Sequence, residues 1–131
     1  MTNDLEQLSQ YQYINLETFR RSGVGVKTPV WFVNKDDALF VRTLANSGKV
    51  KRIRHTGRVN IAPCKADGAL LGEWIPAFAR EVKDELIESQ VERLLDKKYG
   101  LMKKIFALFS KLQGRQGTIL EIRLVESPSI K

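Results

Sequence analysis

The residues with the clearest potential for chemistry form a basic stretch in the first half of the chain. Between Ala38 and Ala66 there is no Asp or Glu, and the same interval holds seven cations: Arg42, Lys49, Lys51, Arg52, Arg54, Arg58 and Lys65. The whole chain has a formal net charge of +7, and elsewhere its acidic and basic residues are mixed. The positive excess is therefore local, and such an excess attracts an anionic partner.

The most informative part of this stretch is a predicted helix start. Ser47 is a residue type that caps helices, and residues 48–55 follow with Val50 and Ile53 at apolar positions. Cations in the first turn oppose the partial positive charge of a helix N-terminus, each at a cost of roughly a few tenths of a kcal/mol. A phosphate reverses this effect, because backbone N–H groups and lysines then face one anion. A solvated basic helix that tolerates the small penalty is the alternative.

A second candidate site lies on a predicted strand that contains a proline. Pro29 cannot donate a hydrogen bond to a neighbouring strand, so it indicates an edge or a bulge. Backbone groups beside it can then bond the edge of a planar polar ring. Trp31, two residues further along the same face, is positioned to pack on that ring, although the residues by themselves favour the alternative, an edge strand with a core tryptophan. Trp74, between Gly72 and Pro76, fits a core, interface or ligand-wall position.

Local spacing places no side chain for acid–base or nucleophilic catalysis. Cys64 has no histidine or acidic partner beside it, which is typical of a small buried residue, and His55 lies at a predicted helix end. One cysteine and one histidine cannot form a zinc cluster, so no metal site is expected. The catalytic residues stay unknown, and a cofactor would have to supply the chemistry.

The predicted elements that position these residues are mostly strands. Residue patterns and turn signals predict six strands, over residues 13–19, 26–33, 38–43, 58–65, 71–82 and 118–125. The first three are expected to form a meander with a hairpin turn at 34–37. Helices are predicted over 48–55, from the cap Asp84 to Lys98, and over 101–112, with a helical turn at 4–9.

These elements predict a mainly β fold with accessory helices, an antiparallel barrel forming a single domain over residues 1–131. Side chains fill a barrel of this size, so a large ligand is expected at its rim or between subunits. The hydrophobic fraction of 43% and charged fraction of 28% are those of an ordinary globular protein. No apolar run reaches the roughly 20 residues of a membrane span. Residues 1–10 do not resemble a secretory signal, and the single cysteine excludes an internal disulfide, so the expected location is cytoplasmic.

Several short blocks, taken together and in order, resemble a known family. They are Thr28-Pro29-Val30-Trp31-Phe32, Leu39-Phe40-Val41-Arg42-Thr43, Ser47-Gly48-Lys49-Val50-Lys51-Arg52-Ile53-Arg54, Arg58-Val59 and Ala62-Pro63-Cys64. The sequence is similar to the flavin/deazaflavin oxidoreductases, also called the pyridoxamine 5'-phosphate oxidase-like class, and most of all to their deazaflavin-using branch. The resemblance covers residues 11–82 and 118–125.

The resemblance implies a six-stranded antiparallel split β-barrel that forms a homodimer, with a cofactor in a groove at the dimer interface. That cofactor is riboflavin monophosphate (FMN) or the deazaflavin coenzyme F-420. The positions that match the family's phosphate-binding stretch are Arg42, Thr43, Ser47, Lys49, Lys51 and Arg52. Those that match the strand beside the ring system are Thr28, Pro29, Val30 and Trp31, and Trp74 matches a region that reaches the groove.

The implied activity is hydride transfer between the cofactor ring and a small organic substrate. Residues specific to a true pyridoxamine-phosphate oxidase are not evident, and the role of residues 84–112 stays open. Two alternatives remain: a non-catalytic carrier of the same fold, and a basic small barrel that binds nucleic acid. Few aromatic residues fall on the exposed strand faces, which disfavours nucleic acid as a partner.

Overall fold

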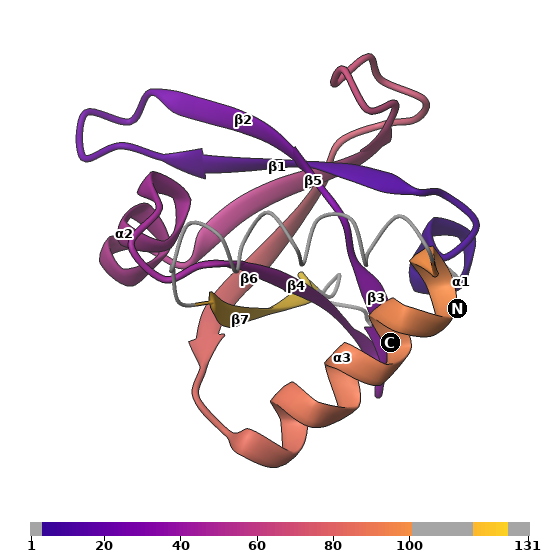
Figure 1. The fold of residues 1–131 in the computed structure, drawn as a ribbon. Helices are drawn as coiled ribbons and strands as arrows, with labels where there is room; N and C mark the ends of the chain where they lie inside the picture. The colour runs from indigo at the N-terminus through magenta and orange to yellow at the C-terminus, as the bar shows by residue number, and fades with distance from the viewer. Residues whose placement is uncertain (1–3, 101–116, 126–131) are drawn as a thin grey trace, which may run out of the picture.

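The computed structural model describes residues 4–100 and 117–125, and shows a curled antiparallel sheet with helices at its margins (Figure 1). The strands are Tyr13–Phe19 (β1), Gly25–Val30 (β2), Val33–Lys35 (β3), Ala38–Leu44 (β4), Arg58–Cys64 (β5), Ile75–Val82 (β6) and Gly117–Leu124 (β7). The helices are Asp4–Leu8 (α1), Gly48–His55 (α2) and Glu85–Tyr99 (α3). The helix predicted over 101–112 lies outside the described residues. None of the described helices is both long and apolar enough to cross a bilayer.

The strand order explains why the sheet curls. Its seven strands are hydrogen-bonded in the order β2-β1-β5-β6-β7-β4-β3. β2 and β3 thus lie at opposite edges of the sheet, although only Trp31 and Phe32 separate them in the chain. The chain crosses from one edge to the other through these two residues, so the sheet must wrap around a common interior. This is the predicted split barrel, with seven strands in place of six.

The extra strand comes from a bend within the predicted strand 26–33, and the predicted meander is wrong for the same reason. β2 pairs with β1, whereas β3 pairs with β4. At the bend, Phe32 is fully buried and its N–H donates to the hydroxyl of Tyr99 at 3.0 Å. That hydroxyl lies 2.9 Å from the carbonyls of Phe32 and Gln12 and can donate to either. A side chain from α3 therefore replaces the strand partner that Phe32 lacks.

Two layers of apolar side chains hold the sheet. The interior is filled from alternate strand positions that include Ile14, Leu16, Val41, Ile61 and Leu120. On the outer face, α3 packs Val91, Leu95 and Tyr99 against Phe40, Val82 and Ile119. The predicted cap of α3 is confirmed, because the Asp84 carboxylate accepts hydrogen bonds from the N–H groups of Leu86 and Ile87. Helix α3 thus closes the outer face near β3.

Two further differences from the prediction lie at a hairpin turn and at a strand start. The β3–β4 hairpin turns on Asp36 and Asp37 alone, both with positive φ (50° and 64°), which is the geometry of a tight two-residue hairpin. β6 begins at Ile75, not at residue 71, because residues 65–74 form a loop. The side-chain amide of Asn15 donates to the Gly68 carbonyl of that loop at 3.0 Å. The loop is thereby held against the outer side of β1.

Candidate functional site

The start of α2 is the first part of the candidate site. β4 ends at Leu44, the Ser47 N–H donates to the Leu44 carbonyl, and the Ser47 carbonyl accepts from Lys51. Ser47 has the extended backbone of an N-cap residue, yet its side chain makes no capping hydrogen bond. Its hydroxyl is buried and has no hydrogen-bond partner among the described residues. A buried hydroxyl left unpaired is costly, so this position suits a ligand that bonds it.

Two cations lie close to this helix start. Lys49 is half-buried, and burial lowers its pKa, with the charge of Arg52 lowering it further. Burial also lowers the pKa of Arg52, and so does the charge of Arg20. The Arg52 Nε donates to Thr18 Oγ1 on β1 at 2.7 Å. In the described part of the chain, no carboxylate forms an ion pair with Lys49 or Arg52, so an anion would relieve their mutual repulsion.

The other residues of the predicted phosphate stretch lie in different surroundings. Lys51 is exposed on α2, and Thr43 is partly buried on β4, where it pairs with Thr118. Arg42 forms an ion pair with Glu92 of α3. Strand alternation places Arg42 on the same side of β4 as Phe40, which packs under α3. The structure therefore does not bring Arg42 together with Lys49 and Arg52.

Arg42 borders a separate cleft of about 270 Å³ between α3 and the β4–β7 pair. Its lining is Arg42, Glu85, Glu88, Ser89, Glu92, Gly117, Thr118 and Ile119. The three carboxylates come from one side of α3, and among the described residues no group of side chains has the arrangement needed to hold a metal ion. At the edge of this cleft, the carboxylate of Glu92 on α3 forms the ion pair with Arg42.

The predicted ring-binding residues are divided between two faces of β2. Thr28 pairs with Leu16 and therefore lies on the interior side, the side from which Thr18 reaches Arg52. Val30 pairs with Ile14 on that same interior side. Pro29 pairs with Asn15 on the opposite, outer side, two residues from Lys27.

Trp74 is on the outer side as well. The Nζ of Lys27 lies over its ring, 5.4 Å from the centroid. The Lys27 side chain faces away from the interior, because Lys27 pairs with the outward-facing Glu17. Trp74 is therefore not brought to α2 within one chain.

Trp31 does not stay on the face of Pro29 as expected. Its ring stacks on Tyr99 with centroids 4.3 Å apart and planes inclined by 7°. Next to it, Lys98 Nζ donates to the Phe32 carbonyl at 3.1 Å and lies 3.6 Å from the centroid of the Phe32 ring. Burial lowers the pKa of Lys98 to about 8 and raises that of Tyr99 to about 12. The bend after Val30 turns Trp31 toward α3.

An ion pair fixes α2 on the barrel. The guanidinium of Arg54 donates from Nε and Nη2 to the two oxygens of Glu81 on β6, at 2.8 and 3.0 Å. Nη2 also approaches the Ala45 carbonyl in the loop before the helix, at 3.4 Å. Thr118 donates to Glu81 at 2.7 Å, and the pKa of Glu81 falls to about 2, mainly through the Arg54 hydrogen bond. Arg54 is thus an exposed residue that anchors α2 to the barrel.

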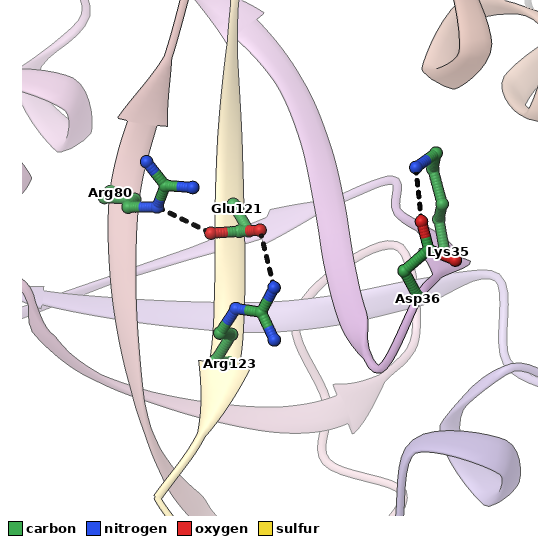
Figure 2. Close-up of polar contacts among 5 residues, drawn as sticks. All are labelled: Lys35, Asp36, Arg80, Glu121 and Arg123. Carbon is green, nitrogen blue, oxygen red and sulfur yellow. Dashed lines mark hydrogen bonds and ion pairs between the residues drawn. The ribbon is translucent and has the colours of Figure 1, made fainter. Parts of the chain in front are cut away.

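A second charged cluster lies on the outer face of the sheet and joins β6 to β7 (Figure 2). Glu121 on β7 is buried and accepts hydrogen bonds from Arg80 at 2.6 Å and Arg123 at 3.1 Å. Burial alone would raise the pKa of Glu121, but the two arginines lower it overall. Figure 2 also shows the exposed pair Lys35–Asp36 at the β3–β4 hairpin. Each of these carboxylates has a cationic partner, whereas Lys49 and Arg52 at the start of α2 have no carboxylate partner among the described residues.

Sequence reasoning missed four residues around the site: Thr18, Arg20, Glu81 and Tyr99. Each acts through a partner distant in sequence, and no local motif marks it. The only available signal was for Thr18, which follows the buried Ile14 and Leu16 in the inward-facing row of β1. A polar residue in that row needs a hydrogen-bond partner.

Comparisons with known proteins agree with this architecture. No protein-family model matches the sequence, and no curated protein matches it. Solved structures do match, and the chain has the split-barrel fold of pyridoxamine 5'-phosphate oxidase-like proteins.

Three of these structures illustrate the likeness. The heme storage protein HutZ from Vibrio cholerae has a TM-score of 0.71 at 15% identity, over 95% of this chain and 89% of that one. A Listeria innocua protein assigned as a pyridoxamine 5'-phosphate oxidase has a TM-score of 0.66 at 15% identity, over 93% and 90%. An F420 reductase has a TM-score of 0.60 at 14% identity, over 96% and 97%. At these identities the likeness establishes the fold.

Proposed function

We propose that this protein binds FMN or coenzyme F-420 through its phosphate at the start of α2, and catalyses hydride transfer with a small organic substrate. The observation that carries the proposal is the unpartnered, buried hydroxyl of Ser47 beside two cations, Lys49 and Arg52, that have no carboxylate partner among the described residues. These groups suit a phosphate, because helix N–H groups, a hydroxyl and charged donors converge on one anion.

The protein's part in the reaction is binding and orientation. When bound, the cofactor supplies the ring that carries the hydride. Ser47, Lys49 and Arg52 hold the phosphate, with Lys51 at the solvent side. β2 is an edge strand, so part of its backbone N–H and C=O groups face away from β1 and can bond the edge of the ring near Thr28. Holding ring and substrate in one orientation and excluding water favours direct transfer.

A homodimer is part of this proposal. Within one chain, Thr28 lies on the interior side of β2, whereas Pro29 and Trp74 lie on the outer side. One bound ring cannot contact both sides of the same strand. A second copy that supplies its Trp74 would complete the groove, which is why we assign Trp74 to the site of the partner subunit.

Equilibrium binding of FMN and F-420, measured side by side by absorbance and fluorescence, tests the proposal. We expect micromolar or tighter binding of one of them, weakened at least about tenfold in Lys49→Ala. The matched control is Lys97→Ala, which removes the same charge from an exposed position on α3. This variant is expected to bind the cofactor as the unmodified chain does. If neither cofactor binds while single-stranded nucleic acid does, the proposal is wrong.

A carrier function is the second candidate, because a heme storage protein has the same fold. The reduced cofactor distinguishes the two functions. An enzyme accelerates its oxidation when an electron-accepting substrate is added, whereas a carrier binds it without turnover.

A further inference from the structure

Arg52 reaches across the start of α2 to β1. Its Nε donates to Thr18 Oγ1 at 2.7 Å. A methyl group added at Gly48, the first residue of the helix, would lie 2.8 Å from Arg52 Nη1. The guanidinium therefore lies between β1 and the first turn of α2, with one end held by Thr18 and the other beside Gly48.

Thr18 is an unusual residue for its position. It is 1% exposed and follows Ile14 and Leu16, both 0% exposed, in the inward-facing row of β1. An apolar β-branched residue would fill this space as well, since valine differs from threonine only in replacing the hydroxyl with a methyl group. What threonine adds is a buried oxygen, and that oxygen accepts from Arg52. The hydroxyl therefore orients a cation, in addition to filling space.

The orientation of the Arg52 guanidinium matters because the first turn of α2 lies beside it. The first N–H groups of an α-helix have no acceptor within the helix, and here they belong to the turn that begins at Gly48. Ser47 leaves them uncapped. A guanidinium fixed at its Nε keeps its two terminal nitrogens for a second partner, and this planar arrangement fits a phosphate.

We infer that Thr18 is a positioning residue that aims Arg52 at the cofactor's phosphate and makes the site selective for phosphorylated over unphosphorylated cofactor. This inference rests on the proposed function. It extends the site from the basic stretch to β1. Burial lowers the pKa of Arg52 and repulsion by Arg20 lowers it further, and this repulsion adds to the demand for an anion at the same place.

The experiment compares Thr18→Val, Thr18→Ser and the unmodified chain in binding FMN and riboflavin, and F-420 and its phosphate-free nucleoside. Thr18→Val keeps the shape but removes the acceptor, so we expect binding of the phosphorylated cofactor to weaken about tenfold. Binding of the phosphate-free form should stay within about twofold, since the inference places Arg52 at the phosphate and not at the ring. Thr18→Ser retains the hydroxyl, so its ratio of affinities for the phosphorylated and the phosphate-free cofactor should equal that of the unmodified chain. Equal ratios in all three proteins would overturn the inference.

Arg52→Lys is a second variant that leaves the interior unchanged. It keeps the charge but cannot both bond Thr18 and offer a planar pair of donors, so it should lower the same ratio. Adding Thr18→Val to Arg52→Lys should then cause little further loss, because the two act as one unit. If Arg52→Lys binds the phosphorylated cofactor as tightly as the unmodified chain, Arg52 does not read the phosphate and the inference fails.

Inorganic phosphate separates this inference from the proposed function. Its effect on the melting temperature is measured in the unmodified chain and the two Thr18 variants. Stabilisation that is lost in Thr18→Val and kept in Thr18→Ser, without binding of either cofactor, would refute the proposed function and retain only the part of the inference in which Thr18 aims Arg52 at a phosphate. Binding of neither phosphate nor cofactor would refute both.

Discussion

At the residue scale, the N-terminal cap residues of α2 and α3 behave differently. Asp84 accepts hydrogen bonds from two N–H groups of α3, at 2.9 and 3.3 Å. Ser47, at the start of α2, caps nothing, and its buried hydroxyl has no partner among the described residues. Serine and aspartate are both common cap residues, so these two positions are told apart by their contacts and not by residue type.

Replacing Ser47 with alanine measures this difference. Loss of a working cap costs about 1 kcal/mol, so Asp84→Ala should lower the free energy of unfolding by about that amount. Ser47→Ala should lower it by less than about 0.5 kcal/mol, because no capping bond is lost. Urea unfolding without added ligand is the measurement. A loss in Ser47→Ala as large as that in Asp84→Ala would show that Ser47 supports the helix.

Tyr99→Phe tests the side chain that completes the bend between β2 and β3. The variant keeps the ring that stacks on Trp31 but leaves the buried N–H of Phe32 without its acceptor. We expect the free energy of unfolding to fall by about 1–3 kcal/mol. Tyr11→Phe, which removes a hydroxyl from a partly buried ring packed on the core, is the control. If Tyr99→Phe and Tyr11→Phe lowered the free energy of unfolding by the same small amount, the Tyr99 hydroxyl would not be needed for stability.

At the element scale, α2 is held to β6 by the Arg54–Glu81 pair, and its first turn has no side-chain cap. The bounds of α2 and β1 were predicted correctly from the sequence, because each depends on residues within a few positions of one another. The bend between β2 and β3 was not. Its cause is a hydrogen bond between Phe32 and Tyr99, which are 67 residues apart.

The Arg54–Glu81 pair predicts a pH dependence of stability. The pKa of Glu81 is lowered from 4.5 to about 2 in the folded chain. A carboxyl with a lowered pKa stabilises the fold fully above its unfolded pKa, and this contribution is lost as the pH falls toward the folded value. The stability difference between the unmodified chain and Glu81→Gln should be greatest near neutral pH and shrink between about pH 4.5 and 2. Urea unfolding across this range checks it, and a difference independent of pH would contradict the assignment.

At the scale of the whole molecule, the sheet places the candidate residues on two sides of one strand. This arrangement predicts a dimer. Sedimentation equilibrium at tens of micromolar should give twice the chain mass of 15.0 kDa. A mass of 15.0 kDa at that concentration would remove the proposed interfacial groove and leave Trp74 outside the site.

The sequence alone determined the basic stretch, the short helix after Ser47 and the mainly β class of the fold. These follow from residue types and spacings that act over a few positions. Only the tertiary structure decided which cations share a site. It pairs Arg42 with Glu92 and turns Trp31 onto Tyr99, whereas it joins Arg52 of α2 to Thr18 of β1. The physical reason is that strand alternation and long-range pairing set the direction of each side chain, and neither is local in the sequence.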